Sequence, residues 1–282
     1  MSDPVESQLY AAAHEGLASE VSSLLRDHPG LDVHWENQLS YFQTALHTAS
    51  VNGHVDVVKL LLAHPNIKVN LRQQYGRTPF ALSCANGNEA VIRVLLKDSR
   101  IDITLADHAE RTPLWIASCS GHDKAIEWLI ASGRELGDVK NKKGKHWDDQ
   151  EYTALEIATK KDQAKATSVL ERFIANPAQT RYEIRVKLEV LDEVVTEVFA
   201  LIIFLCDGLL QLKPASEPAV TLNQAVATAG ATRFFVIVKR LPMELQMILC
   251  HRVMGSARQN ILRKDSEAAF KSLAAFLLLP CF

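Results

Sequence analysis

The residues of this 282-residue chain that could do chemistry are its ten histidines, its five cysteines and its carboxylates. Two places put an imidazole beside a carboxylate, as general acid–base catalysis requires: His122-Asp123 and His146-Trp147-Asp148. Neither stands in a motif that supplies a third catalytic group, so both are interpreted as isolated. The chain contains no G-x-S-x-G, H-E-x-x-H or C-x-x-C motif and no glycine-rich phosphate loop. The sequence therefore predicts a protein without catalysis, cofactor or metal.

Composition narrows the class of protein further. The five cysteines stand at positions 84, 119, 206, 250 and 281, and an odd number without paired spacing is typical of free thiols in a reducing compartment. A net charge of −2 offers no basic excess for nucleic acid. The most apolar run, residues 198–206, has nine residues, whereas a membrane-spanning helix needs about 20. We expect a cytoplasmic or nuclear protein with no membrane partner.

A motif recurs at a nearly fixed interval through the first half of the chain. TALHTASVNGHVDVVKLLL (44–62) is followed by TPFALSCANGNEAVIRVLL (78–96) and TPLWIASCSGHDKAIEWLI (112–130). Glycines recur at intervals of 37, 34 and 34 residues, at Gly16, Gly53, Gly87 and Gly121. A further copy starts at Thr153 and has Asp162 where the glycine is expected.

Each copy has the elements of a helical hairpin. A threonine, often followed by proline, can cap a first helix, and the glycine suits the left-handed conformation that ends it. Small residues on the first helix allow close packing, and Cys84 and Cys119 occupy such positions, so we expect them to be buried and inert. Branched apolar residues on the second helix cannot be buried by one copy alone. Stacking of the copies must therefore complete the core.

These motifs resemble the ankyrin repeat family. The resemblance covers residues 7–175 and implies a mainly α-helical solenoid of about five helix–turn–helix units with projecting hairpin fingers. The implied domain is 1–177, with repeats near 7–37, 39–72, 73–106, 107–147 and 148–175. The family histidine that braces the turn stands only at His47, and units with another residue there are expected to be less rigid: Tyr10, Ala81, Trp115 and Glu156.

The resemblance also implies a non-catalytic module that binds a partner protein on a concave surface. The expected contacts lie at the finger tips and at exposed positions of the first helices: Tyr41, Gln43, Asn52, Gln74, Tyr75, Arg77, Asn86, His108, Glu110, Arg111 and Ser120. Tyrosine and arginine are residue types that anchor interfaces.

Some of these residues have a second interpretation. Tyr41 and Tyr75 occupy equivalent positions on adjacent fingers, where they either form an aromatic groove or pack the hairpin. Trp115 is expected to pack. Residues 134–152, which carry four lysines, are interpreted as a solvated loop, with a partner contact or an import signal as the alternatives. Asn70 stands where the family is often hydroxylated, but we expect an ordinary hairpin asparagine.

The repeat stops near residue 178, and residues 178–282 are predicted to form an α-rich region with a hairpin near 198–213. The segment LPMELQMIL resembles the opening of an F-box, which implies docking on a cullin-type ubiquitin ligase through Leu241, Pro242, Leu245, Ile248 and Leu249. The chain would then be a substrate adaptor. The same helix could instead cap the last repeat. A third hypothesis is an enzyme whose site gathers His251, Asp265 or Glu267.

Overall fold

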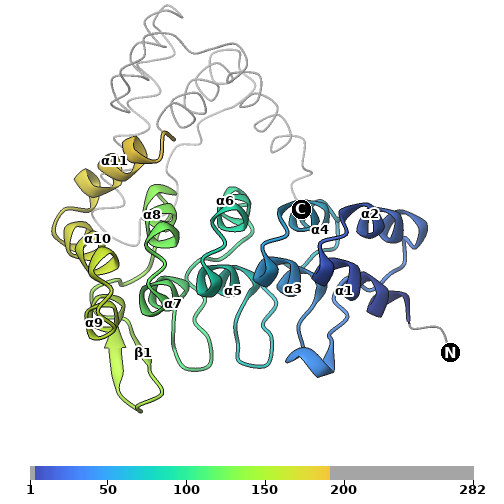
Figure 1. Ribbon diagram of the computed structural model, residues 1–282, viewed down its shortest axis with the longest axis horizontal. Coiled ribbons are helices and arrows are strands. Elements are labelled where there is room, and N and C mark those ends of the chain that lie inside the picture. The colour runs from blue at the N-terminus through green and yellow to red at the C-terminus, as the bar shows by residue number, and fades with distance from the viewer. Residues whose placement is uncertain (1–3, 191–282) are drawn as a thin grey trace, which may run out of the picture. The chain divides into compact units, whose positions relative to one another are not determined.

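The structure, a computed structural model, describes residues 4–190 (Figure 1). The chain divides into two compact units, residues 1–184 and 185–282. The hairpin predicted near 198–213, the F-box-like segment and His251, Asp265 and Glu267 lie outside the described residues. The described part is mainly helical, as predicted, with a short two-stranded hairpin as its sheet.

Inner and outer helices alternate along the first unit. Each inner helix packs on the next inner helix, and each outer helix on the next outer helix, so two parallel rows form (Figure 1). The inner row comprises α1 (Val5–Glu15), α3 (Ala45–Asn52), α5 (Pro79–Asn86), α7 (Pro113–Ser120) and α9 (Ala154–Lys160). The outer row comprises α2 (Ala18–Asp27), α4 (Val55–Leu62), α6 (Glu89–Lys97), α8 (Asp123–Ala131) and α10 (Ala164–Ala175).

Loops lead from each outer helix to the next inner helix and project away from the outer row (Figure 1). The first contains the 3-10 turn η1 (Gln38–Ser40), and the last contains the strands β1 (Lys143–Lys145) and β2 (Glu151–Thr153). The two strands pair antiparallel, with Gly144 opposite Tyr152. The helix α11 (Pro177–Lys187) follows the last outer helix.

The threonines cap the inner helices as predicted. The Oγ atoms of Thr78, Thr112 and Thr153 each accept a hydrogen bond from the backbone N–H three residues ahead, at 3.2 Å. Each cap satisfies one of the N–H groups that a helix start leaves without a partner.

The expected bracing histidine, His47, links its own helix to the next loop. It is fully buried, and its Nε2 lies 3.0 Å from the carbonyl oxygen of Leu71. Burial lowers the pKa of His47 to about 4, so the ring is neutral at pH 7.

Trp115 takes the place of this bracing histidine two units later. It is buried, and its Nε1 donates a hydrogen bond to the carbonyl of Tyr152 at 2.7 Å. The prediction that Trp115 packs is confirmed, and its unit keeps a brace.

The core lies between the two rows of helices. Four small residues of the inner helices have no exposed surface: Ala49, Cys84, Ala117 and Ala158. Branched residues of the outer helices meet them there, including Val58, Ile92 and Ile126. Cys84 is fully buried as expected, and burial raises the pKa of its thiol. The same expectation is wrong for Cys119, which is only partly buried because it lies in the last turn of α7 beside the exposed Ser120.

The repeating glycines end the inner helices and make room for the neighbouring unit. Gly87 has a φ of 66°, and a Cβ atom there would lie 2.5 Å from Nδ1 of His122 in the next unit. The His122 side chain crosses above the glycine, and its Nε2 lies 3.0 Å from the carbonyl oxygen of Ala85. Equivalent side chains cover the other glycines: His54 over Gly16, Asn88 over Gly53 and Gln163 over Gly121. The exposed Asp162 takes the same conformation in the last unit, with a φ of 55°.

Helix α11 packs at the end of the stack, which extends the first unit past residue 177. Thr180 and Ile184 are buried. The Nε atom of Arg181 donates to the carbonyl of Ile130 in α8 at 3.1 Å, and its guanidinium lies 5.8 Å from the Phe173 ring centroid. The apolar end of α10 is thereby covered.

We expect Gly87→Ala to lower the free energy of unfolding by about 2–3 kcal/mol, because alanine is strained at this positive φ and its methyl group displaces His122. Urea denaturation followed by circular dichroism measures this change. Gly30→Ala is the matched control, since a Cβ there meets no atom within 4 Å. Equal stability of the two variants would contradict the account of the inter-unit contact.

Candidate interaction surface

Four fingers project from the inner row, at residues 37–43, 73–77, 107–111 and 143–153. A backbone N–H···O bond closes each tip. The donor and acceptor are Asn37 and Gln43 in the first finger at 2.9 Å, and His146 and Gln150 in the fourth at 2.9 Å. The second and third fingers close in the same way at 3.0 Å. We call the face made by these fingers and the exposed ends of the inner helices the finger surface.

Backbone hydrogen bonds also join each finger to the next. The N–H of Gln74 donates to Tyr41 at 2.9 Å, and the N–H of His108 donates to Tyr75 at 3.0 Å. The N–H of Lys145 donates to Ala109 at 2.8 Å. Because the fingers are linked in this way, side chains on different tips are held at fixed spacings.

The first two tips carry an exposed aromatic pair. The rings of Tyr41 and Tyr75 have centroids 5.3 Å apart with an interplanar angle of 45°, yet the residues remain 53% and 49% exposed. Tyr41 and Phe42 both have positive φ, at 56° and 58°, a conformation that bulky residues rarely adopt. Leu39 beside them is 97% exposed. Tyr41 thus contacts the neighbouring finger and remains accessible to a partner.

A buried carboxylate organises the third finger. Asp107 has no exposed side-chain surface and accepts hydrogen bonds from the N–H groups of Ala109 and Arg111, at 3.0 and 3.1 Å. Its Oδ2 lies 2.8 Å from an Arg111 nitrogen and 3.2 Å from Nε of Arg77. Burial alone would raise the pKa of Asp107, but the arginines and the backbone donors outweigh it and hold the pKa below its usual range.

The two arginines predicted as partner contacts are therefore also structural, since each makes an ion pair with Asp107. The role of Asp107 could not be predicted from its sequence context, because a carboxylate in a loop is usually exposed. Asp107 occupies the position in the third finger that Gln73 occupies in the second. The Gln73 side chain likewise accepts a hydrogen bond from a backbone N–H of its own finger, that of Tyr75.

The remaining predicted contacts are spread along the finger surface. Asn52 and Asn86 are exposed at the ends of α3 and α5, and their amides donate to backbone carbonyls of His14 and Leu82 at 3.0 Å. Glu110 pairs with Lys142, which directly precedes the fourth finger. His108 and Ser120 are exposed, and Gln43 is half-buried beside its backbone bridge to Asn37. All eleven predicted residues thus lie in the fingers or at the ends of the inner helices.

The fourth finger departs most from the sequence-based interpretation. The segment 134–152 is mostly exposed as predicted, but residues 143–145 pair with 151–153 as a hairpin instead of a loop, and His146 is buried within it. The His146 ring lies 3.8 Å from the Trp147 ring, centroid to centroid, and 6.5 Å from that of Trp115. Gly144 allows this packing, because a Cβ there would lie 2.7 Å from Cγ of Arg111.

Charged and aromatic groups meet at this hairpin. Lys160 of α9 donates to the Asp148 carboxylate at 2.5 Å and holds the pKa of Asp148 well below its usual range. The Lys160 ammonium also lies 4.5 Å from the Tyr152 ring centroid. Trp147 is 74% exposed. Trp147 was not among the predicted contacts, although a tryptophan in a polar segment is itself a signal of a contact residue.

Asn70 has the structural role expected of a hairpin asparagine. Its Nδ2 donates to the carbonyl of Arg100 at 2.8 Å, and its Oδ1 accepts from the N–H of Asp102 at 2.9 Å. Both contacts tie one loop to the next.

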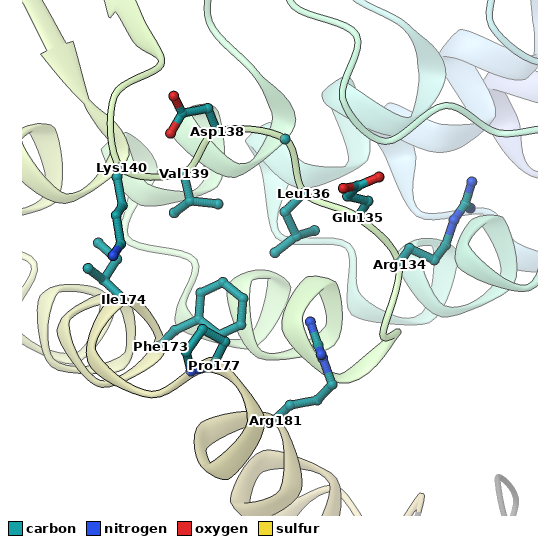
Figure 2. Close-up of a pocket in the computed structure, with 11 residues that line it drawn as sticks. Arg134, Glu135, Leu136, Asp138, Val139, Lys140, Phe173, Ile174, Pro177 and Arg181 are labelled. Carbon is teal, nitrogen blue, oxygen red and sulfur yellow. The ribbon is translucent and has the colours of Figure 1, made fainter. Parts of the chain in front are cut away.

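A separate groove of about 440 Å³ lies between residues 134–140 and the helices α10 and α11 (Figure 2). Leu136, Val139, Phe173 and Pro177 line it, and Arg181 stands at its edge (Figure 2). Its charged groups do not form a catalytic arrangement. Within residues 4–190, no group of histidine, cysteine and acidic residues could hold a metal ion, and no helix is long and apolar enough to cross a membrane.

The fold and finger surface define a helical repeat solenoid. Comparison with known families identifies the repeat: residues 9–107 match three ankyrin repeats, and residues 110–142 match one further ankyrin repeat. These matched residues are therefore ankyrin repeats. The chain is similar to Rabankyrin-5 of Mus musculus, with 36% identity over 76 residues that make up 27% of this chain and 6% of the mouse protein. The chain thus matches only a small part of that relative's length.

We expect Asp107→Asn to lower the free energy of unfolding by about 3 kcal/mol at pH 7, because both arginines lose a buried ionic partner. The lowered pKa of Asp107 means that its contribution is present above the unfolded pKa of about 4 and is lost as the pH falls through the folded value. Urea denaturation at pH 7 and pH 3 should therefore show a smaller difference between wild type and variant at pH 3.

The exposed pair of Asp56 and Lys59 provides the control for this prediction. Asp56→Asn should change the free energy of unfolding by less than about 0.5 kcal/mol at either pH. A difference between wild type and Asp107→Asn that does not change with pH would contradict the assigned role of the carboxylate.

Proposed function

We propose that this chain binds a partner protein on its finger surface without catalysing a reaction, in the cytoplasm or the nucleus. Ankyrin repeats form protein–protein interaction modules. The proposal rests chiefly on Tyr41 and Tyr75, two exposed tyrosines held 5.3 Å apart on linked finger tips. Exposed aromatic groups on a rigid support lose little entropy on binding and are typical interface anchors.

The backbone at this site supports the same proposal. Tyr41 and Phe42 keep positive φ angles, and strained residues of this kind gather at functional sites. Leu39 and Phe42 extend the apolar surface beside the tyrosines. Exposed apolar side chains that cluster on one face are typical of a protein contact.

We expect the double variant Tyr41→Ser/Tyr75→Ser to bind the partner at least about tenfold more weakly, because both anchors are truncated. Affinity capture with the full chain from source cells identifies the candidate partner, and calorimetric titration with that purified protein gives the dissociation constant.

Tyr182→Ser is the matched control, since this tyrosine is 41% exposed on α11, away from the fingers. It should leave the dissociation constant within about twofold. Equal affinity of the wild type and the double variant would overturn the proposed binding surface.

A further inference from the structure

The two ends of the finger surface, residues 37–43 and the region around Cys119, differ in charge. Finger residues 37–43 carry no charged side chain. The opposite end, around Cys119 of α7, carries three cations. The Arg111 guanidinium lies 5.8 Å from the centroid of the Trp115 ring, and the Lys161 ammonium lies over the Trp147 ring of the same hairpin cluster. Burial raises the pKa of the Cys119 thiol, while Lys161, Arg111 and Arg77 oppose that rise. Cys119 is partly exposed, so this region is open to a partner.

These cations are not fully neutralised. Arg77 and Arg111 share the single carboxylate of Asp107, which is buried beneath them. Lys161 takes part in none of the ion pairs found within residues 4–190; its ammonium instead lies 4.0 Å from the centroid of the Trp147 ring. The site therefore has an excess of positive charge close to solvent.

An exposed aromatic surface adjoins this charge. Trp147 is 74% exposed, and its ring stacks on the buried ring of His146. The Nε2 atom of His146 has no hydrogen-bond partner among the described residues, although Nδ1 lies 3.1 Å from Asp148. A rigidly supported tryptophan beside a cation can hold an apolar side chain whose neighbours carry carboxylates.

The surrounding acidic residues disfavour a nucleic acid. Asp148 and Asp149 of the fourth finger and Glu110 of the third pair with Lys160, Lys145 and Lys142, respectively. A continuous phosphate backbone would meet these carboxylates along its path and be repelled. A short peptide can place its acidic side chains at the three cations alone.

We propose that the finger surface selects a partner segment that carries acidic residues, which bind Arg77, Arg111 and Lys161, next to an apolar residue that packs on Trp147. This inference rests on the proposed function, since it names the chemistry of the partner that the finger surface binds. Charge complementarity of this kind gives specificity and speeds association.

The test uses a library of random twelve-residue peptides displayed on phage and selected on the full chain. The recovered peptides should be enriched in aspartate and glutamate relative to the starting library. A synthetic peptide from this set should bind Lys161→Glu about tenfold more weakly than wild type, because the charge is reversed. Trp147→Ser should also weaken it, and circular dichroism should show that both variants are folded.

Lys165→Glu is the matched control, because it makes the same charge change at an exposed position of the outer helix α10. It should leave the affinity within about twofold. Recovered peptides without acidic enrichment, or equal effects of the two charge reversals, would overturn the inference. Tighter binding of a twenty-residue oligothymidylate than of the selected peptides would also overturn it.

The outcomes separate this inference from the proposed function. Peptides that lose affinity for Tyr41→Ser/Tyr75→Ser but not for Lys161→Glu would leave the finger surface in place and remove its acidic preference. Peptides that respond to neither change would remove both.

Discussion

The contact between a glycine and the side chain that covers it is the constraint on which the stack depends. At Gly87 the chain turns with a positive φ, and His122 of the next unit fills the space that a Cβ atom would take. The same side chain binds the free carbonyl of Ala85 at the end of the inner helix. One residue thus satisfies a helix end and fixes the position of the neighbouring unit. In the last unit Asp162 stands in place of the glycine, and its side chain fits because this position is exposed. Helix α11, instead of a further repeat, packs there on α8 and α10.

The fingers inherit their spacing from this stack and add a second set of links. Carbonyls of Tyr41, Tyr75 and Ala109 accept hydrogen bonds from the next finger, while Asp107 draws two arginines together from adjacent fingers. The result is a supported row of tips rather than four independent loops. Such preorganisation lowers the entropy lost on binding, because the aromatic and charged groups need not be ordered by the partner. In the binding mode that we propose, Arg77 and Arg111 serve the fold and the partner together.

The sequence predicted the repeat well because its signals are local and repeated. The threonine caps, the glycines and the small residues such as Ala49 and Ala117 each report one physical requirement that every unit shares. Side-chain partners between units were not predictable in the same way. Burial of Asp107 depends on arginines that two fingers bring together, and burial of His146 depends on Trp115 and on the close approach allowed at Gly144. The exposed Trp147 was missed because the lysines around it favoured a solvated loop.

The measurement that tests binding at the finger surface most directly is site-specific photocrosslinking in living cells. The photoreactive residue p-benzoylphenylalanine would be placed at position 75, at position 147 and, as a reference, at position 182, each in the full chain. We expect positions 75 and 147 to crosslink to the same partner protein, since both side chains are exposed on one finger surface, and position 182 to give no such adduct. A partner that crosslinks from position 182 and from neither finger position would contradict the account.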